Sequence, residues 1–155
     1  MRIGLAVLFI SHVAAGCAPR AAFDVTVVNH TNSPLTIGLV KDGPPFEDQW
    51  ATPDEVALHT GGLDAMPPWG HVVPPGRTLD SPAVTGAFPE GTTANLRVYR
   101  GERRNAELLA ISDPSPDRAQ VLLFPGHNEI VVTEGPKGLR AERTRRAAPS
   151  PSTGR

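Results

Sequence analysis

Short apolar runs separated by proline and glycine constrain this chain more than any other feature. The 155 residues include 17 prolines and 15 glycines, which are spread along the sequence rather than collected in one tract. Because these two residue types interrupt regular structure and mark turns, the pattern predicts many short strands joined by loops. The length of the chain fits one domain with one modest core.

Alternating polarity identifies the individual strands. In residues 23–29 the side chains of Phe23, Val25 and Val27 fall on one side, as in a half-buried strand. Residues 35–40 alternate in the same way after a loop of turn-forming residues, so the two segments are predicted to form a β-hairpin. Further candidate strands span residues 71–73, 77–84, 92–100, 106–111, 119–124 and 129–133, and the last two are predicted to form a second strand–turn–strand unit.

Residues 41–70 form the longest stretch without a strand pattern. Within it, the Thr52 hydroxyl can accept a hydrogen bond from the backbone three residues on, and Glu55 can reach back to the backbone of Thr52. Pro53 suits the first position of a helix. These residues predict one short helix near residues 53–60, inside a long connection.

The number and order of these segments indicate the fold class. About six or seven short strands with one helix favour an all-β sandwich over a parallel α/β sheet, which would need a helix after nearly every strand. The stretch 123–133, in which a Pro-Gly-His-Asn turn precedes the last strand, resembles the final hairpin of bacterial immunoglobulin-like domains. The resemblance implies an immunoglobulin-like β-sandwich, which we place at residues 23–134, and implies nothing about a ligand.

Charge divides the chain into an acidic domain and a basic tail. Residues 17–136 carry eight basic and fifteen acidic side chains, a net charge of −7, whereas residues 137–155 carry six basic side chains and one acidic, a net charge of +5. Residues 135–155 contain one large apolar residue, Leu139, and are predicted to be disordered. Without interleaved aromatic residues, this tail does not predict nucleic-acid binding.

The amino-terminal residues have the pattern of an export signal. Met1 and Arg2 provide a positive start, residues 3–15 are mainly apolar, and small residues precede Cys17. Residues 1–16 are therefore predicted to be a signal peptide. The apolar run is shorter than the roughly 20 residues that a membrane-spanning helix needs. The alternatives are an ordinary secretory signal, or a buried first strand with an unmodified cysteine.

Residues 13–17, with the sequence VAAGC, resemble the lipobox of bacterial lipoproteins. The resemblance implies cleavage before Cys17, attachment of diacylglycerol and fatty acids such as palmitate to that residue, and a lipidated tether over residues 17–22. By the same resemblance, Ala18 implies sorting to the outer membrane. Cys17 is the only cysteine, so its lipidation would leave no thiol for a disulfide, a nucleophile or a zinc site.

Sequence motifs of catalysis and cofactor binding are absent. The chain contains no G-x-S-x-G, H-E-x-x-H, P-loop, G-x-G-x-x-G or S-x-x-K pattern. We therefore predict neither an enzyme nor a cofactor, with an envelope hydrolase of unrecognised site as one alternative. A copper-binding lipoprotein is another, because His59, Met66 and His71 lie in or beside the long connection and copper accepts imidazole and thioether ligands.

Three aromatic residues, Phe46, Trp50 and Trp69, share the connection 41–70. They could form a platform for a sugar or a partner protein, but packing inward to cap the open end of the sandwich is favoured, because an indole ring buries a large area. The sequence thus predicts a non-enzymatic binding or scaffolding domain, tethered to a membrane through Cys17. A protein of the cell envelope is its predicted partner, with the 41–70 connection and the basic tail as candidate surfaces.

Overall fold

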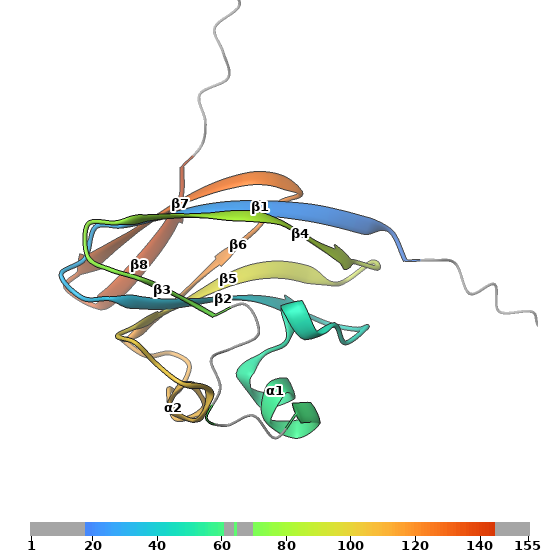
Figure 1. The fold of residues 1–155 in the computed structure, drawn as a ribbon, viewed down its shortest axis with the longest axis horizontal. Coiled ribbons are helices and arrows are strands. Elements are labelled where there is room, and N and C mark those ends of the chain that lie inside the picture. The colour runs from blue at the N-terminus through green and yellow to red at the C-terminus, as the bar shows by residue number, and fades with distance from the viewer. Residues whose placement is uncertain (1–17, 61–63, 65–69, 145–155) are drawn as a thin grey trace, which may run out of the picture.

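Two four-stranded sheets face each other in the structure, a computed structural model that describes residues 18–60, 64 and 70–144. In spatial order, the first sheet contains β4 (Thr78–Ala87), β1 (Arg20–Asn29), β7 (Gly126–Gly135) and β8 (Gly138–Arg143). The second sheet contains β3 (His71–Val73), β2 (Leu35–Asp42), β5 (Thr93–Arg100) and β6 (Arg118–Leu122). The predicted all-β sandwich is confirmed, with eight strands instead of six or seven (Figure 1).

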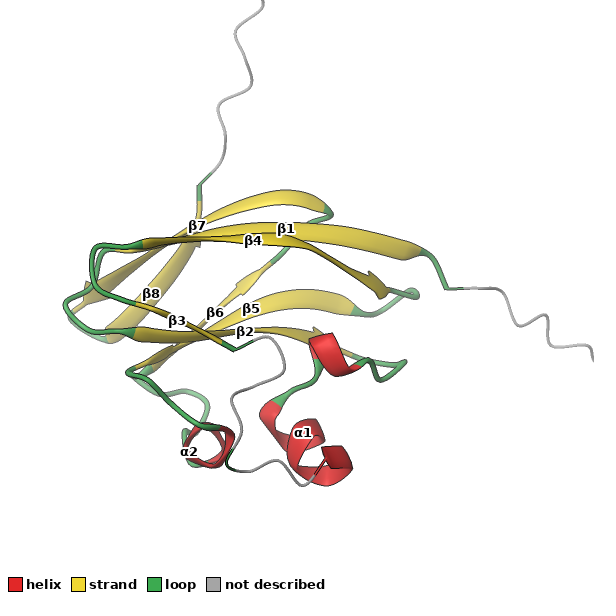
Figure 2. Ribbon diagram, in the orientation of Figure 1, coloured by secondary structure: helices red, strands yellow, loops and turns green. Residues whose placement is uncertain are grey.

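A helical layer covers the outer face of the second sheet (Figure 2). We use this name for the 3₁₀ turn η1 (Asp48–Trp50), α1 (Pro53–Thr60) and α2 (Asn105–Leu109). The predicted helix at residues 53–60 is confirmed together with its cap. The Glu55 carboxylate accepts hydrogen bonds from the backbone N–H and hydroxyl of Thr52, and the Thr52 hydroxyl accepts one from the backbone N–H of Glu55.

The two sheets are buried to different extents. In β1, side chains point alternately into the core and toward solvent, as the sequence predicts. In β2, every residue from Leu35 to Lys41 is buried, because one face packs on the first sheet and the other lies under the helical layer. The core between the sheets contains Phe23, Val25, Val27, Leu35, Ile37, Leu39, Leu96, Val98, Ile130 and Val132.

Both predicted hairpins are wrong. β1 pairs with β4 and, in parallel, with β7, whereas β2 pairs with β3 and β5, so residues 30–34 cross from one sheet to the other. The connection from β6 to β7 crosses in the same way. Alternation shows which side chains enter the core but not which strand supplies the backbone partner, and strands of both sheets share one core.

The segment 106–111, predicted as a strand, contains α2 instead. Leu108 of this helix is buried and lines a small apolar cavity with Leu39 and Pro53, between the second sheet and α1. The Asn105 amide donates to the backbone oxygen of Pro53, which joins the two helices. A short apolar run fits a strand or one helical turn equally well, and here packing on an already formed sheet selects the helix.

The predicted domain, residues 23–134, is too short at both ends. Residues 20–22, predicted as part of the tether, belong to β1 and pair with the end of β4. The predicted disordered tail over residues 135–155 is wrong up to Thr144, because residues 138–143 form β8, whose Leu139 is buried against the core. The rest of that tail lies outside the described residues. No helix in the described part of the chain is long and apolar enough to cross a membrane.

Candidate functional site

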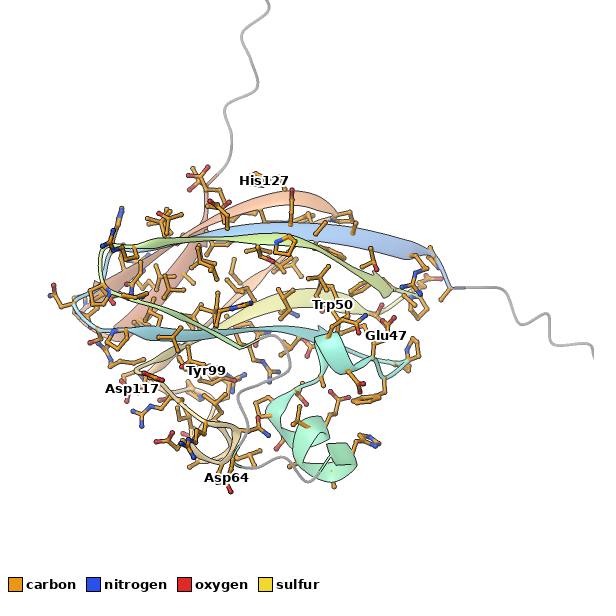
Figure 3. The ribbon with its side chains drawn as sticks, in the orientation of Figure 1. Glu47, Trp50, Asp64, Tyr99, Asp117 and His127 are labelled. Carbon is orange, nitrogen blue, oxygen red and sulfur yellow. The ribbon has the colours of Figure 1, made fainter. Side chains whose placement is uncertain are left out.

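Trp50, one of the predicted surface residues, is fully buried. Its ring meets the rings of Phe23 and Phe88 edge-on, with centroids 5.2 and 5.1 Å away. The indole N–H donates to the backbone oxygen of Thr85 at 3.1 Å, so its polar atom is satisfied as well. Trp50 therefore packs inward at the end of the sandwich where β1 begins (Figure 3), which is the arrangement favoured from the sequence, and it does not contribute to an exposed surface.

Phe46 lies outside the core and is 40% exposed. Its ring centroid is 4.4 Å from that of the His59 imidazole, which belongs to the last turn of α1. This contact connects the segment before η1 to the helix. Trp69, the third predicted aromatic residue, lies outside the described residues, as does Cys17.

Two of the three candidate copper ligands, His59 and His71, lie in different elements. His59 stacks on Phe46, and His71 is the first residue of β3, where it pairs with Ile37. Met66 lies outside the described residues. Within the described part of the chain, no three His, Cys, Asp or Glu side chains are close enough together to hold a metal ion. The arrangement therefore adds nothing in favour of a copper site.

An ion pair fixes the beginning of the long connection. The Lys41 ammonium, almost fully buried, donates to the Glu47 carboxylate at 2.7 Å, and the same carboxylate oxygen accepts the backbone N–H of Ala87 at 2.9 Å. Burial alone would raise the pKa of Glu47, but these hydrogen bonds and the charges of Lys41 and Arg20 outweigh it, so its pKa is lowered. Glu47 thus ties the connection to the ends of β2 and β4 (Figure 3).

The outer surface of the helical layer carries several uncovered apolar side chains. Leu58 of α1 is 81% exposed and Leu109 of α2 is 37% exposed, in addition to Phe46. Their neighbours Val56 and Leu108 are buried, so each helix already has an inward apolar side. Leu58 is therefore almost free of packing contacts in the domain, whereas Leu109 is partly covered.

Charged residues lie at one side of the same layer. Asp64, Glu102, Arg104 and Glu107 line an open depression, and Figure 3 shows Asp64 beside α2. Glu107 accepts a hydrogen bond from the backbone N–H of Arg104 at 2.8 Å, and its pKa is lowered mainly by this bond. Apolar side chains next to mixed charges are typical of a surface that binds another protein.

Comparisons with known proteins leave the family open. No known family model and no curated protein matches the chain. Among solved structures, the chain is similar to the crystal structure of the T6SS lipoprotein TssJ1 from Pseudomonas aeruginosa, with 16% sequence identity and a TM-score of 0.35, over 85% of this chain and 99% of that one. This TM-score does not establish a shared fold.

A histidine–carboxylate pair is the feature most relevant to the alternative of a hydrolase. His127 Nδ1 lies 3.5 Å from the Asp24 carboxylate on the outer face of the first sheet (Figure 3), and both side chains are roughly half-exposed. Histidine-assisted catalysis needs a nucleophile within hydrogen-bond reach of the ring. In the described part of the chain, no serine or threonine hydroxyl is hydrogen-bonded to the His127 imidazole. The hydroxyls of Thr26 and Ser81, for example, donate to Asp80 and to the backbone oxygen of Pro82.

The sequence did not identify α2 as part of the candidate surface. Leu109 was assigned to a strand, although Glu107 stands three residues after Arg104, a spacing that suits a helix start. The candidate site is therefore the outer surface of the helical layer, defined by Phe46, Leu58 and Leu109. Two chain segments far apart in sequence form it, joined by the contact between α1 and α2.

Proposed function

We propose that this chain is a lipoprotein of the bacterial envelope, acylated at Cys17, whose sandwich binds another envelope protein without catalysing a reaction. The outer membrane is the proposed location. The observation that supports binding is the set of exposed apolar side chains on the helical layer, above all Leu58. When a partner removes a leucine this exposed from water, full burial of the side chain stabilises the complex by roughly 1.5–3 kcal/mol.

The position of the layer supports this assignment. The helices lie outside the second sheet, away from the first (Figure 2), so a partner can reach them without disturbing the core. Apolar and aromatic residues are enriched at the centre of protein interfaces, and isolated exposed leucines alone would carry less weight. Here Phe46, Leu58 and Leu109 come from one continuous layer.

Site-specific photo-cross-linking in the native host tests the binding surface. A photoreactive residue at position 58 or 109 is expected to give the same adduct of discrete mass, and the matched position 127, exposed on the outer face of the first sheet, is expected to give none. Leu58→Asp should abolish the adduct at position 109, because it places a charge in an apolar contact. Equal adducts at all three positions, or none at any, would contradict the proposed surface.

Mass spectrometry of the protein from membranes tests the anchor. The expected product begins at Cys17 and carries diacylglycerol, and Cys17→Ser should release the protein from the membrane fraction. Fractionation of the envelope then tests the outer membrane as its location. An unmodified Cys17 thiol, with the leader still attached, would contradict the proposal.

A further inference from the structure

The end of the sandwich where β1 begins contains a shallow apolar groove. The groove is lined mainly by apolar side chains, with two threonines among them: Ala21, Phe23, Phe88, Thr92, Thr93, Ala94, Leu123 and Pro125. Leu122, which also lines it, is 44% exposed, and the adjacent Phe124 is 47% exposed. Two large exposed apolar side chains therefore stand at this groove, one at the end of β6 and one in the connection to β7.

The chain enters the domain at the edge of this groove. The backbone oxygen of Pro19 accepts the N–H of Phe88 at 2.9 Å, and Arg20 pairs with Ala87, so the start of β1 is fixed in place. Cys17 stands two residues before Pro19. Two residues span at most about 7 Å, so acyl chains attached to Cys17 must enter a membrane beside this end.

We infer that this end of the sandwich rests on the surface of the lipid bilayer, with Leu122, Phe124 and the rim of the groove among the headgroups. The inference rests on the proposed acylation of Cys17. A tether this short holds the domain against the bilayer, and apolar side chains at that end then leave water at little further cost in entropy. Figure 1 shows the start of β1 at one extremity of the long axis, so the sandwich stands end-on.

The charged side chains at this end are compatible with a membrane contact that depends on the burial of apolar side chains. The Arg143 guanidinium lies 4.0 Å from the centroid of the Phe124 ring, where its stem can follow the ring while its charge reaches the headgroups. Exposed Glu90, in the loop between β4 and β5, opposes attraction to anionic lipid, and exposed Arg20 at the start of β1 offsets it. Neutral lipid is therefore expected to support the contact.

When the end of the sandwich rests on the bilayer, the helical layer lies at the side of the domain and does not face the membrane. The layer covers the face of the second sheet, and that face runs along the long axis (Figure 2). A partner protein could therefore reach the layer while the domain remains on the membrane.

The test measures the surroundings of a label placed at this end in the full acylated protein. Cys17 is the only cysteine, so once it is acylated, Leu122→Cys supplies the single free thiol for a polarity-sensitive fluorophore. Asn32→Cys, exposed in the crossing segment at the opposite end, is the matched control. After reconstitution into phosphatidylcholine vesicles, the label at 122 should shift to shorter wavelength and lose quenching by aqueous iodide, whereas the label at 32 should not change. Glu90→Cys should behave like Leu122→Cys.

The other outcomes separate the inference from the proposed function. If the protein floats with the vesicles but the label at 122 stays as exposed as that at 32, the end-on seating is wrong and the anchor stands. If the protein does not float and carries no lipid, the proposed function fails. If the label at 122 is already protected in detergent, in a manner that depends on protein concentration, a second copy of the chain covers the groove and the bilayer contact is wrong.

Discussion

Asn128 shows how one buried polar side chain can organise a connection between two sheets. It is fully buried, and its amide oxygen accepts the backbone N–H of Phe124 at 3.0 Å. Its amide nitrogen donates to the backbone oxygens of Phe124 and Gly126, at 2.8 and 2.9 Å. The side chain thereby closes the turn through which the chain passes from β6 to β7, and satisfies backbone groups that neither sheet pairs.

Replacing Asn128 with alanine is expected to lower the free energy of unfolding by about 1–3 kcal/mol, because buried backbone groups lose their partner. The measurement is urea unfolding of the domain, followed by the fluorescence of its tryptophans. Asn32→Ala, in the exposed crossing segment, is the control and should change stability little. An equal effect of the two substitutions would show that the Asn128 hydrogen bonds contribute nothing.

The Lys41–Glu47 pair makes the stability of the domain depend on pH, and the lowered pKa of Glu47 sets the direction of that dependence. Because the pKa of Glu47 is lower in the folded than in the unfolded chain, its contribution is present above the ordinary pKa of glutamate and is lost as the pH falls through the lowered value. Glu47→Gln keeps an oxygen acceptor but removes the negative charge that faces the Lys41 ammonium, and should cost about 1.5–3 kcal/mol at neutral pH. The difference between wild type and variant should shrink in acid.

Unfolding by urea at neutral and at acid pH measures this difference. Replacing both partners, Lys41→Met with Glu47→Leu, is the control, because two well-packed apolar side chains leave no unpaired charge and should cost less than Glu47→Gln. A loss from Glu47→Gln that is the same at both pH values would contradict the role given to the carboxylate.

At the scale of elements, β8 depends on its surroundings more than on its own sequence. It pairs with β7 along its whole length, and the backbone N–H of Leu139 donates to the oxygen of Pro116. Gly138 approaches Pro116 so closely that an added Cβ would lie 2.3 Å from its oxygen, and its φ is +116°. Only glycine fits such a position, so the turn into β8 is specific although the strand itself is polar.

Ending the chain after Thr144 should leave stability unchanged, whereas ending it after Pro136 should lower it by about 1.5–3 kcal/mol or more, since Leu139 loses its place in the core. The shorter chain also leaves the edge of β7 unpaired, so it should associate at high concentration. Thermal unfolding and size-exclusion chromatography measure the two effects. Equal stability of both truncated chains would mean that β8 does not support the fold.

At the scale of the whole molecule, Trp50 joins the helical layer to the first sheet. It is the last residue of η1, packs on Phe23 of β1 and donates to the backbone of β4. Gly86 makes room for it, because a Cβ there would lie 2.5 Å from the indole nitrogen. The two sheets are connected by Arg100 of β5, which forms ion pairs with Asp117 and with Glu134 of β7.

Gly86→Ala is expected to destabilise the molecule by about 1–3 kcal/mol through overpacking against the indole ring. Trp50→Phe removes the crowded nitrogen, so the cost of Gly86→Ala should be smaller in that background than in the wild type. A double-mutant cycle from urea unfolding measures this coupling. Additive effects of the two substitutions would show that positions 86 and 50 are not energetically coupled through steric contact.

The sequence by itself determined the class of the fold and the residues of its core. The alternation at Phe23, Val25 and Val27 and the capping residues of α1 reflect interactions between near neighbours, which the local sequence specifies. The sequence also favours inward packing of the aromatic residues in the long connection, but it does not distinguish Trp50, which is buried, from Phe46, which is 40% exposed. A local pattern indicates which side chains of a segment can be buried, but it does not indicate which other part of the chain will pack against them.

Only the tertiary structure decided which strands pair, that residues 105–109 form a helix, and that β8 exists. It also buried Trp50 and left Leu58 and Leu109 uncovered. The physical reason is the same in each case. Pairing, the choice between a strand and a helical turn, and exposure all depend on surfaces contributed by residues distant in sequence, and these surfaces exist only once the two sheets have packed.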